Sequence, residues 1–108
     1  MTDEQPGTRI DVTLVAGGMY HDIDYARLEL LKLMGEHEEF RVRVQPDYED
    51  TDAITAGSIL VSYTCNVRPT EASQQAIRGW VEGGGRWIAL HGTNSALDIG
   101  TPNGVDAP

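Results

Sequence analysis

The sequence predicts an α/β fold, in which helices cover both faces of a parallel β-sheet. Three observations lead to this class. Strand-like and helix-like segments alternate along the chain, and this order is typical of βαβ units with right-handed crossovers. Most of the strand-like segments become apolar on both faces, as strands inside a parallel sheet do. The helix-like segments also carry start and stop signals at their ends.

The first strand is predicted over residues 9–16, where apolar residues first alternate with polar ones and then occupy both faces. Gly17 and Gly18 follow and predict a tight turn. A helix is predicted from about residue 23 to residue 37, because apolar residues recur there at three-and-four spacing. An aspartate on either side of residue 23 is available to cap its first turn.

The second and third strands are predicted over residues 40–45 and 58–63. In the second strand, apolar residues alternate with Arg41 and Arg43, which indicates one polar or helix-flanked face and a position near a sheet edge. The acidic segment 47–57 between the two strands predicts no more than a short turn of helix. The third strand is apolar in character and belongs inside the sheet.

A second full helix is predicted over residues 70–82, with a glutamate near its positive end and three glycines, 83–85, at its finish. Its apolar residues share one face. The fourth strand follows over residues 86–90 and leads directly into the polar turn HGTNSA. We expect Trp80 and Trp87 to lie in the core.

The chain is at most one ordinary domain, because 108 residues bury a single modest core. Residues 1–8 are predicted to be a flexible N-terminus, residues 9–98 the ordered domain, and residues 99–108 a loop or a truncated end. A four-stranded sheet of this kind leaves an edge or a face uncovered. We therefore expect residues 9–98 to be the N-terminal part of a larger domain.

Charge and cysteine content exclude several classes of protein. Eight basic and seventeen acidic residues give a net charge of −9, which repels phosphate backbones and anionic membranes. We expect neither a nucleic-acid nor a membrane partner. No stretch is long or apolar enough to span a bilayer or to act as a signal peptide, and the single cysteine, Cys65, cannot form an internal disulfide. These features favour a cytoplasmic protein, and a homo-oligomer is left open.

Ligands of parallel α/β sheets bind outside the carboxyl ends of the strands. Three loops that contain glycines or polar residues are predicted at that edge: GGMYHD, TCNVRP and HGTNS. The glycine pair of the first loop lets the chain or a ligand come close to the strand end. Neither a G-x-G-x-x-G motif nor a P-loop is present, which argues against a phosphate site. A phospho-receiver domain is rejected, because the third strand does not end in a carboxylate.

Two histidines at strand ends are candidates for chemistry. His21 lies just before a predicted helix, whose N-terminus favours a neutral imidazole that can accept a proton or bind a metal. His91 follows the fourth strand at the position where strand-turn-helix elbows display a nucleophile, and an imidazole there can relay protons. Either histidine could instead be satisfied by local hydrogen bonds. Asp22 is a third candidate, although helix capping is the commonest role of such a residue.

Other assignments are left open or set aside. His21, Asp22 and His91 could form a two-histidine, one-carboxylate set, so a divalent metal is an alternative; no other cofactor is predicted. Nothing in their spacing requires a metal. His37 is interpreted as a solvated residue at a helix end. Cys65 is interpreted as a small core residue more readily than as a reactive thiol.

The loop VAGGMYHD and the block SYTCNVRPTEASQQAIRGWVEGGGRWIALHG together resemble the trehalose-utilisation, or ThuA-like, family. The resemblance covers residues 10 to about 98. It implies a three-layer, flavodoxin-like fold of the class I glutamine amidotransferase-like type. In the amidotransferase relatives the fourth-strand elbow carries a catalytic cysteine; the matching residue here is His91, so glutaminase activity is not expected. Complete members of the family continue well beyond this length.

The resemblance also implies a role in the utilisation of trehalose or a related sugar. The reaction would act on a sugar or keto-sugar in a cleft at the carboxyl ends of the strands, with His21, Asp22 and His91 as catalytic candidates. The substrate-binding candidates lie in or beside the same loops: Gly17, Gly18, Tyr63, Asn66, Gly92 and Asn94. Two alternatives remain, a non-catalytic sugar-binding or scaffolding module and a metal-dependent hydrolase.

Overall fold

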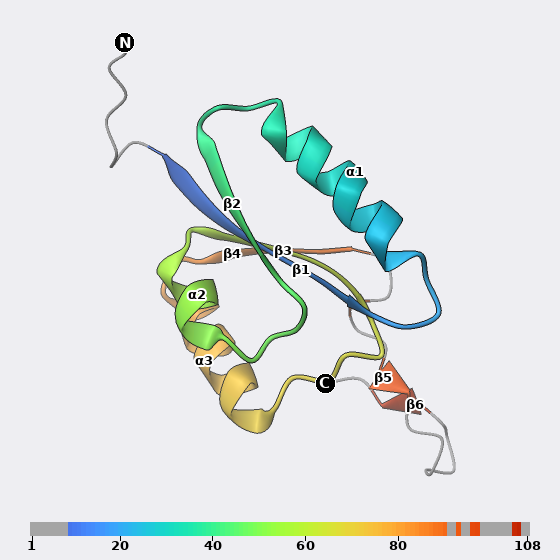
Figure 1. Cartoon of the computed structure of the whole chain (residues 1–108). Helices are drawn as coiled ribbons and strands as arrows, with labels where there is room; N and C mark the ends of the chain where they lie inside the picture. The colour runs from blue at the N-terminus through green and yellow to red at the C-terminus, as the bar shows by residue number, and fades with distance from the viewer. Residues whose placement is uncertain (1–8, 91–92, 94–95, 98–104, 107–108) are drawn as a thin grey trace.

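Four strands form one parallel sheet in the order β2-β1-β3-β4 (Figure 1). The computed structural model describes residues 9–90, 93, 96–97 and 105–106. The strands are β1 (Ile10–Gly18), β2 (Phe40–Gln45), β3 (Ile59–Cys65) and β4 (Arg86–Leu90). The predicted α/β class with a parallel sheet is therefore confirmed, and this strand order is compatible with a flavodoxin-like layout.

Three helices connect the strands and lie on both sides of the sheet. They are α1 (Ile23–Gly35), α2 (Thr51–Ala56) and α3 (Glu71–Glu82). The first covers one face, called here the α1 face, and the other two cover the opposite face, called the α3 face (Figure 1). This arrangement follows from the right-handed crossover rule, because the chain moves across the sheet in one direction after β1 and in the other after β2.

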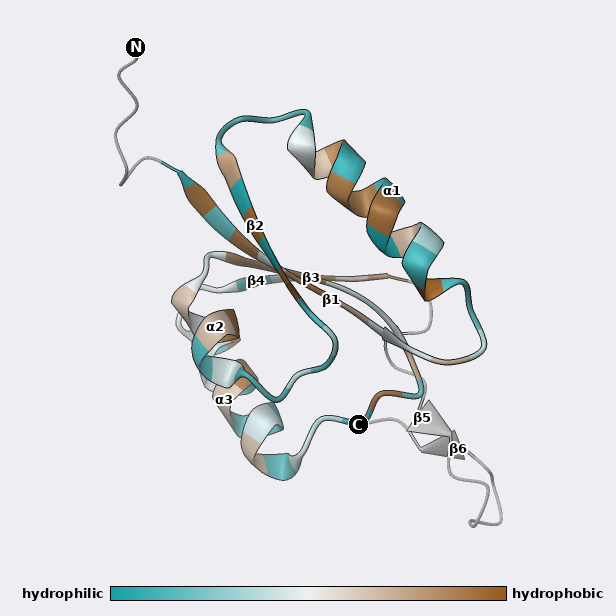
Figure 2. Ribbon diagram, in the orientation of Figure 1, coloured by the Kyte–Doolittle hydropathy of each residue, from teal (hydrophilic) through white to brown (hydrophobic). Residues whose placement is uncertain are grey.

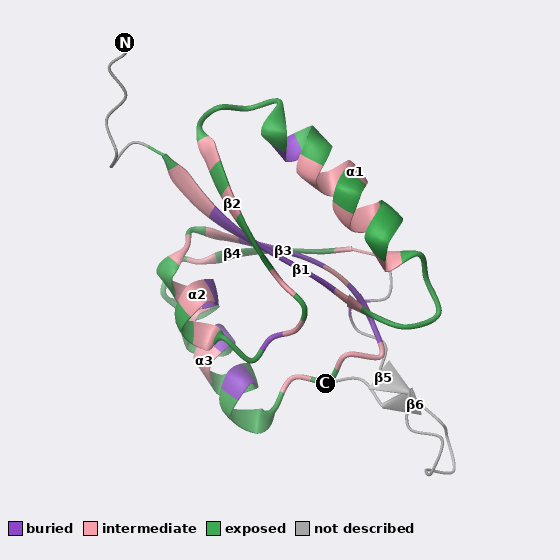
Figure 3. Cartoon of the chain, in the orientation of Figure 1, coloured by how far each residue is buried: buried purple, intermediate pink, exposed green. Residues whose placement is uncertain are grey.

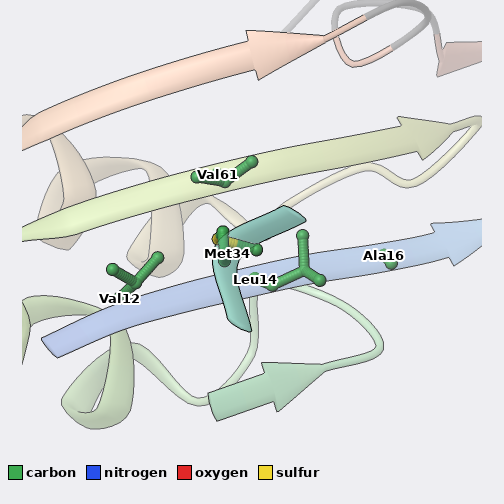
Figure 4. Packing of buried hydrophobic residues seen from close by; sticks show 5 residues of the cluster. All are labelled: Val12, Leu14, Ala16, Met34 and Val61. Atoms are coloured by element: carbon green, nitrogen blue, oxygen red, sulfur yellow. The ribbon is translucent and has the colours of Figure 1, made fainter. Parts of the chain in front are cut away.

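The core on the α1 face is built from alternate residues of the two central strands. Leu14 is completely buried and packs with Val12, Ala16, Val61 and Met34 (Figure 4). Of these five residues only the methionine comes from α1, so the helix covers side chains that alternate strand positions place on the same face. This cluster confirms that the first strand is apolar on the face that a helix covers.

The core on the α3 face uses the intervening strand positions. Val15 and Leu60 are fully buried there and pack against Ile54 of α2 and Ile77 of α3, with Tyr48 beside them. Buried residues consequently run along the middle of the sheet, whereas the outer sides of the helices are exposed (Figure 3). The apolar colouring of the central strands follows the same course (Figure 2).

Side-chain caps fix the beginnings of the helices. The carboxylates of Asp22 and Asp50 accept backbone N–H groups of α1 and α2, and the Thr70 hydroxyl accepts the N–H of Ser73 at 3.1 Å. Each cap satisfies one of the donors that the first helical turn leaves without a partner. The long helices thus begin where their sequence signals predict, and α1 ends at Gly35, two residues before the predicted end.

The two edge strands of the sheet differ in character. On β2, Arg41 forms an ion pair with Asp11 of β1 at 2.7 Å, and its guanidinium lowers the pKa of that carboxyl group. The pair is open to solvent and therefore adds little to stability. On β4, the side chain of Trp87 is 39% exposed, so the prediction of a core position for it is wrong. Trp80 is half-buried and its indole N–H donates to the carbonyl oxygen of Gly57 at 3.0 Å.

Two short strands form a separate antiparallel pair, β5 (Ala96–Leu97) with β6 (Val105–Asp106). The second of them falls within the segment 99–108, for which the sequence predicts a loop; over its two residues the backbone is extended and paired instead. Among the helices of the described residues, none combines the length and the apolar character that a bilayer crossing requires.

Candidate functional site

The carboxyl ends of β1 and β3 lie side by side at one edge of the sheet. The register pairs Gly18 with Cys65, and on the other side of β3 it pairs Tyr63 with Leu90, the last residue of β4. The loops that follow these strands therefore begin at a common edge, as the sequence predicts for parallel neighbours. We call this region the carboxyl edge.

The glycine pair at the end of β1 allows close packing of the chain against itself. A Cβ atom on Gly17 would overlap the carbonyl oxygen of Pro46, and one on Gly18 would overlap the carbonyl oxygen of Cys65. Gly18 also has a φ of +108°, which residues with side chains rarely adopt. Neighbouring backbone thus accounts for both glycines, and their contact with a ligand stays a prediction.

Two of the predicted site residues come together on the α1 face of the carboxyl edge. The rings of His21 and Tyr63 lie edge to face, with centroids 6.4 Å apart and planes inclined by 74°. His21 is exposed in the loop after β1, whereas Tyr63 is half-buried near the end of β3. An imidazole and a phenol therefore reach one surface from positions that are 42 residues apart in the sequence.

Asp22 already has a structural role. Its carboxylate oxygen Oδ1 accepts the backbone N–H of Tyr25 at 3.0 Å and so caps α1. The capping interpretation of this residue is confirmed. Its catalytic role stays a prediction. In that role, the same carboxylate would have to act on a substrate while it caps α1.

The loops after β1 and β3 are linked by two direct contacts. The backbone N–H of Met19 donates to the carbonyl oxygen of Cys65 at 3.1 Å, and the amide Nδ2 of Asn66 lies 3.4 Å from the Met19 sulfur. Tyr20 and Asn66 both have left-handed backbone conformations, with φ of 74° and 60°. For a tyrosine this conformation is uncommon, and such backbone persists only where surrounding contacts hold it.

Three predicted site residues, His91, Gly92 and Asn94, lie outside the described residues. Cys65 is buried, in agreement with its interpretation as a small core residue. His37 is exposed beyond the far end of α1, where its ring lies 5.7 Å from that of Phe40. It takes no part in the carboxyl edge, as expected from the sequence.

A row of buried hydroxyl groups on the α3 face of β3 was not predicted. The hydroxyls of Tyr48 and Thr64 lie 3.0 Å apart, and the indole N–H of Trp87 donates to Ser62 Oγ at 2.8 Å. The Thr93 hydroxyl lies 3.2 Å from the same Ser62 oxygen. The only sequence signal for this network is the alternation of hydroxyl residues within an otherwise apolar strand.

A groove of about 630 Å³ runs along α3 on the same face. Tyr48, Ile77 and Trp87 contribute its apolar surface, and polar side chains of α3 form one wall. Of the predicted site residues that the structure describes, none lines it. We place the candidate site at the carboxyl edge rather than in this groove, because no histidine or cysteine among the described residues lines the groove, whereas His21 stands at the edge.

Within the described part of the chain, no group of three or more histidine, cysteine, aspartate or glutamate side chains is placed to hold a metal ion. The set of His21, Asp22 and His91 includes a residue outside that part, so this finding does not apply to it. His21 and Asp22 remain two neighbouring ligands that such a set would use.

Comparison with known proteins adds no further assignment. No family model, curated protein or solved structure matches the chain significantly. The geometry of the carboxyl edge is therefore the basis for the function proposed below.

Proposed function

We propose that the carboxyl edge binds a small polyhydroxylated molecule, a sugar or keto-sugar, and that His21 transfers a proton to or from it. The observation that carries the proposal is the pairing of His21 with Tyr63 at the edge of a parallel sheet. Such edges are the usual ligand sites of this fold class, and an imidazole is the commonest general acid or base. The resemblance to ThuA-like proteins supports a disaccharide such as trehalose as the substrate class.

Each residue has a separate part in this proposal. The exposed imidazole of His21 would take or supply the proton, because it is the more exposed of the two rings and a histidine can exchange a proton near neutral pH. The phenol of Tyr63 and the amide of Asn66 would donate or accept hydrogen bonds with sugar hydroxyls. His91, which follows Leu90 directly in the sequence, would supply the second imidazole, with Gly92 and Asn94 beside it.

The proposed setting is the cytoplasm, because the one cysteine of the sequence, Cys65, is a buried free thiol and cannot form an internal disulfide. The same net charge of −9 argues against nucleic acid as a partner. Neutral sugars carry no charge and are not repelled by such a surface.

His21→Ala is expected to reduce turnover of the sugar by about 100-fold or more, since a positioned general acid or base contributes that much. The matched control is His37→Ala, which removes the exposed imidazole at the other end of α1 and should leave turnover unchanged. The assay measures turnover and calorimetric binding of trehalose and of an oxidised disaccharide.

Three outcomes separate the alternatives. Loss of turnover in His21→Ala, with turnover retained in His37→Ala, supports the proposal. Binding without turnover in the unchanged protein would indicate a non-catalytic sugar-binding module. Turnover that survives His21→Ala would remove this histidine from the mechanism.

A further inference from the structure

Tyr20, in the loop after β1, has an unusual backbone and an unusual environment for an aromatic residue. Its φ of 74° lies in the left-handed region, which tyrosine rarely adopts, and its side chain is 63% exposed. The left-handed backbone costs free energy, and an exposed ring does not recover it by burial. Strain of this kind is concentrated at ligand sites and switches. The loop therefore keeps an unfavourable conformation that exposes an aromatic ring at the carboxyl edge.

Hydrogen bonds on both sides of Tyr20 hold this conformation. Before it, the backbone N–H of Met19 donates to the carbonyl oxygen of Cys65 at 3.1 Å. After it, the carbonyl oxygen of His21 accepts the backbone N–H of Ile23 at 2.9 Å. The backbone of Tyr20 is therefore held in place before a ligand arrives. A tyrosine side chain has only two torsions left to lose on binding, so the cost of using this ring is small.

The two residues that flank Tyr20 both reach toward β3 and the loop that follows it. The Met19 sulfur lies 3.4 Å from the amide Nδ2 of Asn66, and the ring of His21 lies edge to face with that of Tyr63. Consecutive Cα atoms are about 3.8 Å apart. A ligand that contacts His21 at this edge therefore lies next to the residue that carries the exposed ring.

The side chains at this edge match the two kinds of surface on a closed sugar ring. A pyranose has hydroxyl groups around its rim and C–H groups on its faces. The phenol of Tyr63 and the amide of Asn66 can form hydrogen bonds with the rim. An aromatic ring such as that of Tyr20 can cover a C–H face and remove it from water. An open-chain sugar has no such face.

We propose that Tyr20 is a specificity-determining residue of the carboxyl edge, and that its ring packs against one face of a pyranose while His21 acts on the rim. This inference rests on the function proposed above. It narrows the substrate class from sugars in general to those with a closed six-membered ring, as in the two units of trehalose.

Tyr20→Ala is expected to weaken the binding of trehalose about tenfold, which corresponds to about 50 Å² of apolar surface covered by the ring. KM should rise by the same factor with kcat unchanged, because packing against a ring face is equal in the substrate and the transition state. Tyr20→Phe keeps the ring and should bind as the unchanged protein does. Calorimetry and initial-rate kinetics of the full chain measure both quantities.

The matched control is Tyr25→Ala, which removes a tyrosine of α1 that is 62% exposed. It makes the same chemical change outside the strained loop and should leave trehalose binding unchanged. Sorbitol, an open-chain polyol, is the probe for ring selectivity. Its binding should be equal in Tyr20→Ala and in the unchanged protein. Equal weakening for sorbitol and trehalose would show that Tyr20 acts on the loop and not on a ring face, and would overturn the proposal.

Tyr20→Asn separates the strained backbone from the ring. Asparagine tolerates the left-handed region better than alanine or tyrosine does. This variant should therefore unfold at a higher urea concentration than Tyr20→Ala, although it binds trehalose just as weakly. A Tyr20→Asn variant that is no more stable than Tyr20→Ala would contradict the strained conformation on which the inference depends.

The outcomes distinguish this inference from the function of His21. Trehalose binding that is equal in Tyr20→Ala and the unchanged protein would overturn the role of Tyr20 alone. Weaker binding in Tyr20→Ala, together with turnover that survives His21→Ala, would support Tyr20 and remove the proton transfer by His21. An unchanged protein that binds no sugar would overturn both.

Discussion

Gly18→Ala is expected to lower the free energy of unfolding by about 3 kcal/mol or more. Two effects act together at this position. The φ of +108° is strained for any residue with a side chain, and the added Cβ would overlap the carbonyl oxygen of Cys65. That oxygen belongs to the backbone of β3 and accepts the N–H of Met19, so it cannot move without breaking the link between the two loops.

The matched control for this substitution is Gly79→Ala in α3. Apart from its chain neighbours and the backbone of its own helix, no atom lies within 4 Å of the Cβ that it adds, and alanine in a helix is more stable than glycine by about 0.5 to 1 kcal/mol. Urea denaturation of the two variants should therefore give changes of opposite sign. If Gly18→Ala unfolds at the same urea concentration as the unchanged protein, the close approach of β1 and β3 at the carboxyl edge is refuted.

Leu14→Ala is expected to lower the free energy of unfolding by about 3 to 4 kcal/mol, which is the usual loss when a large core side chain is removed and a cavity remains. Leu14 is completely buried between the sheet and α1, and its neighbours come from two strands and a helix, so the space cannot close by movement of one side chain (Figure 4).

The comparison for this second variant is Leu33→Ala, which removes the same atoms from a leucine of α1 that is 56% exposed. Its effect should stay within about 0.5 kcal/mol, as for other surface positions. Thermal and urea unfolding both measure the difference. Equal losses in the two leucine variants would show that the α1 face is not packed as described.

Local sequence signals were sufficient to predict where the helices and strands of the sheet lie in the chain. They were not sufficient to predict which elements pack beside each strand. Caps such as Asp22 and Thr70 mark the helix starts, and periodicity separates strands from helices. The alternating pattern of β2 indicated its edge position correctly, but the apolar pattern of β4 did not indicate that this strand lies at the other edge, and the exposure of Trp87 follows from that position. An apolar strand at an edge and one at the centre of a sheet have the same local pattern.

The part of the candidate site that depends only on strand topology was predictable from the sequence. The rule that parallel strands share a carboxyl edge predicts a common cleft for His21 and His91, with Tyr63 among its lining candidates. The rings of His21 and Tyr63 do meet at this edge, whereas His91 lies outside the described residues. The hydrogen bonds of Ser62 with Trp87 and Thr93 depend on cross-strand register, which the sequence does not specify. The packing role of the glycine pair likewise required the positions of the neighbouring backbone.

The central claim is tested most directly by adding sugar to the protein and following the NMR signals of the histidine side chains. The three imidazoles give separate ¹H–¹⁵N signals, and the protein would be titrated with trehalose and with an oxidised disaccharide. The account predicts that the signals of His21 and His91 shift and saturate together, while those of His37, about 20 Å away along α1, stay in place. Signals of His21 that do not move with either sugar, or that move no more than those of His37, would contradict it.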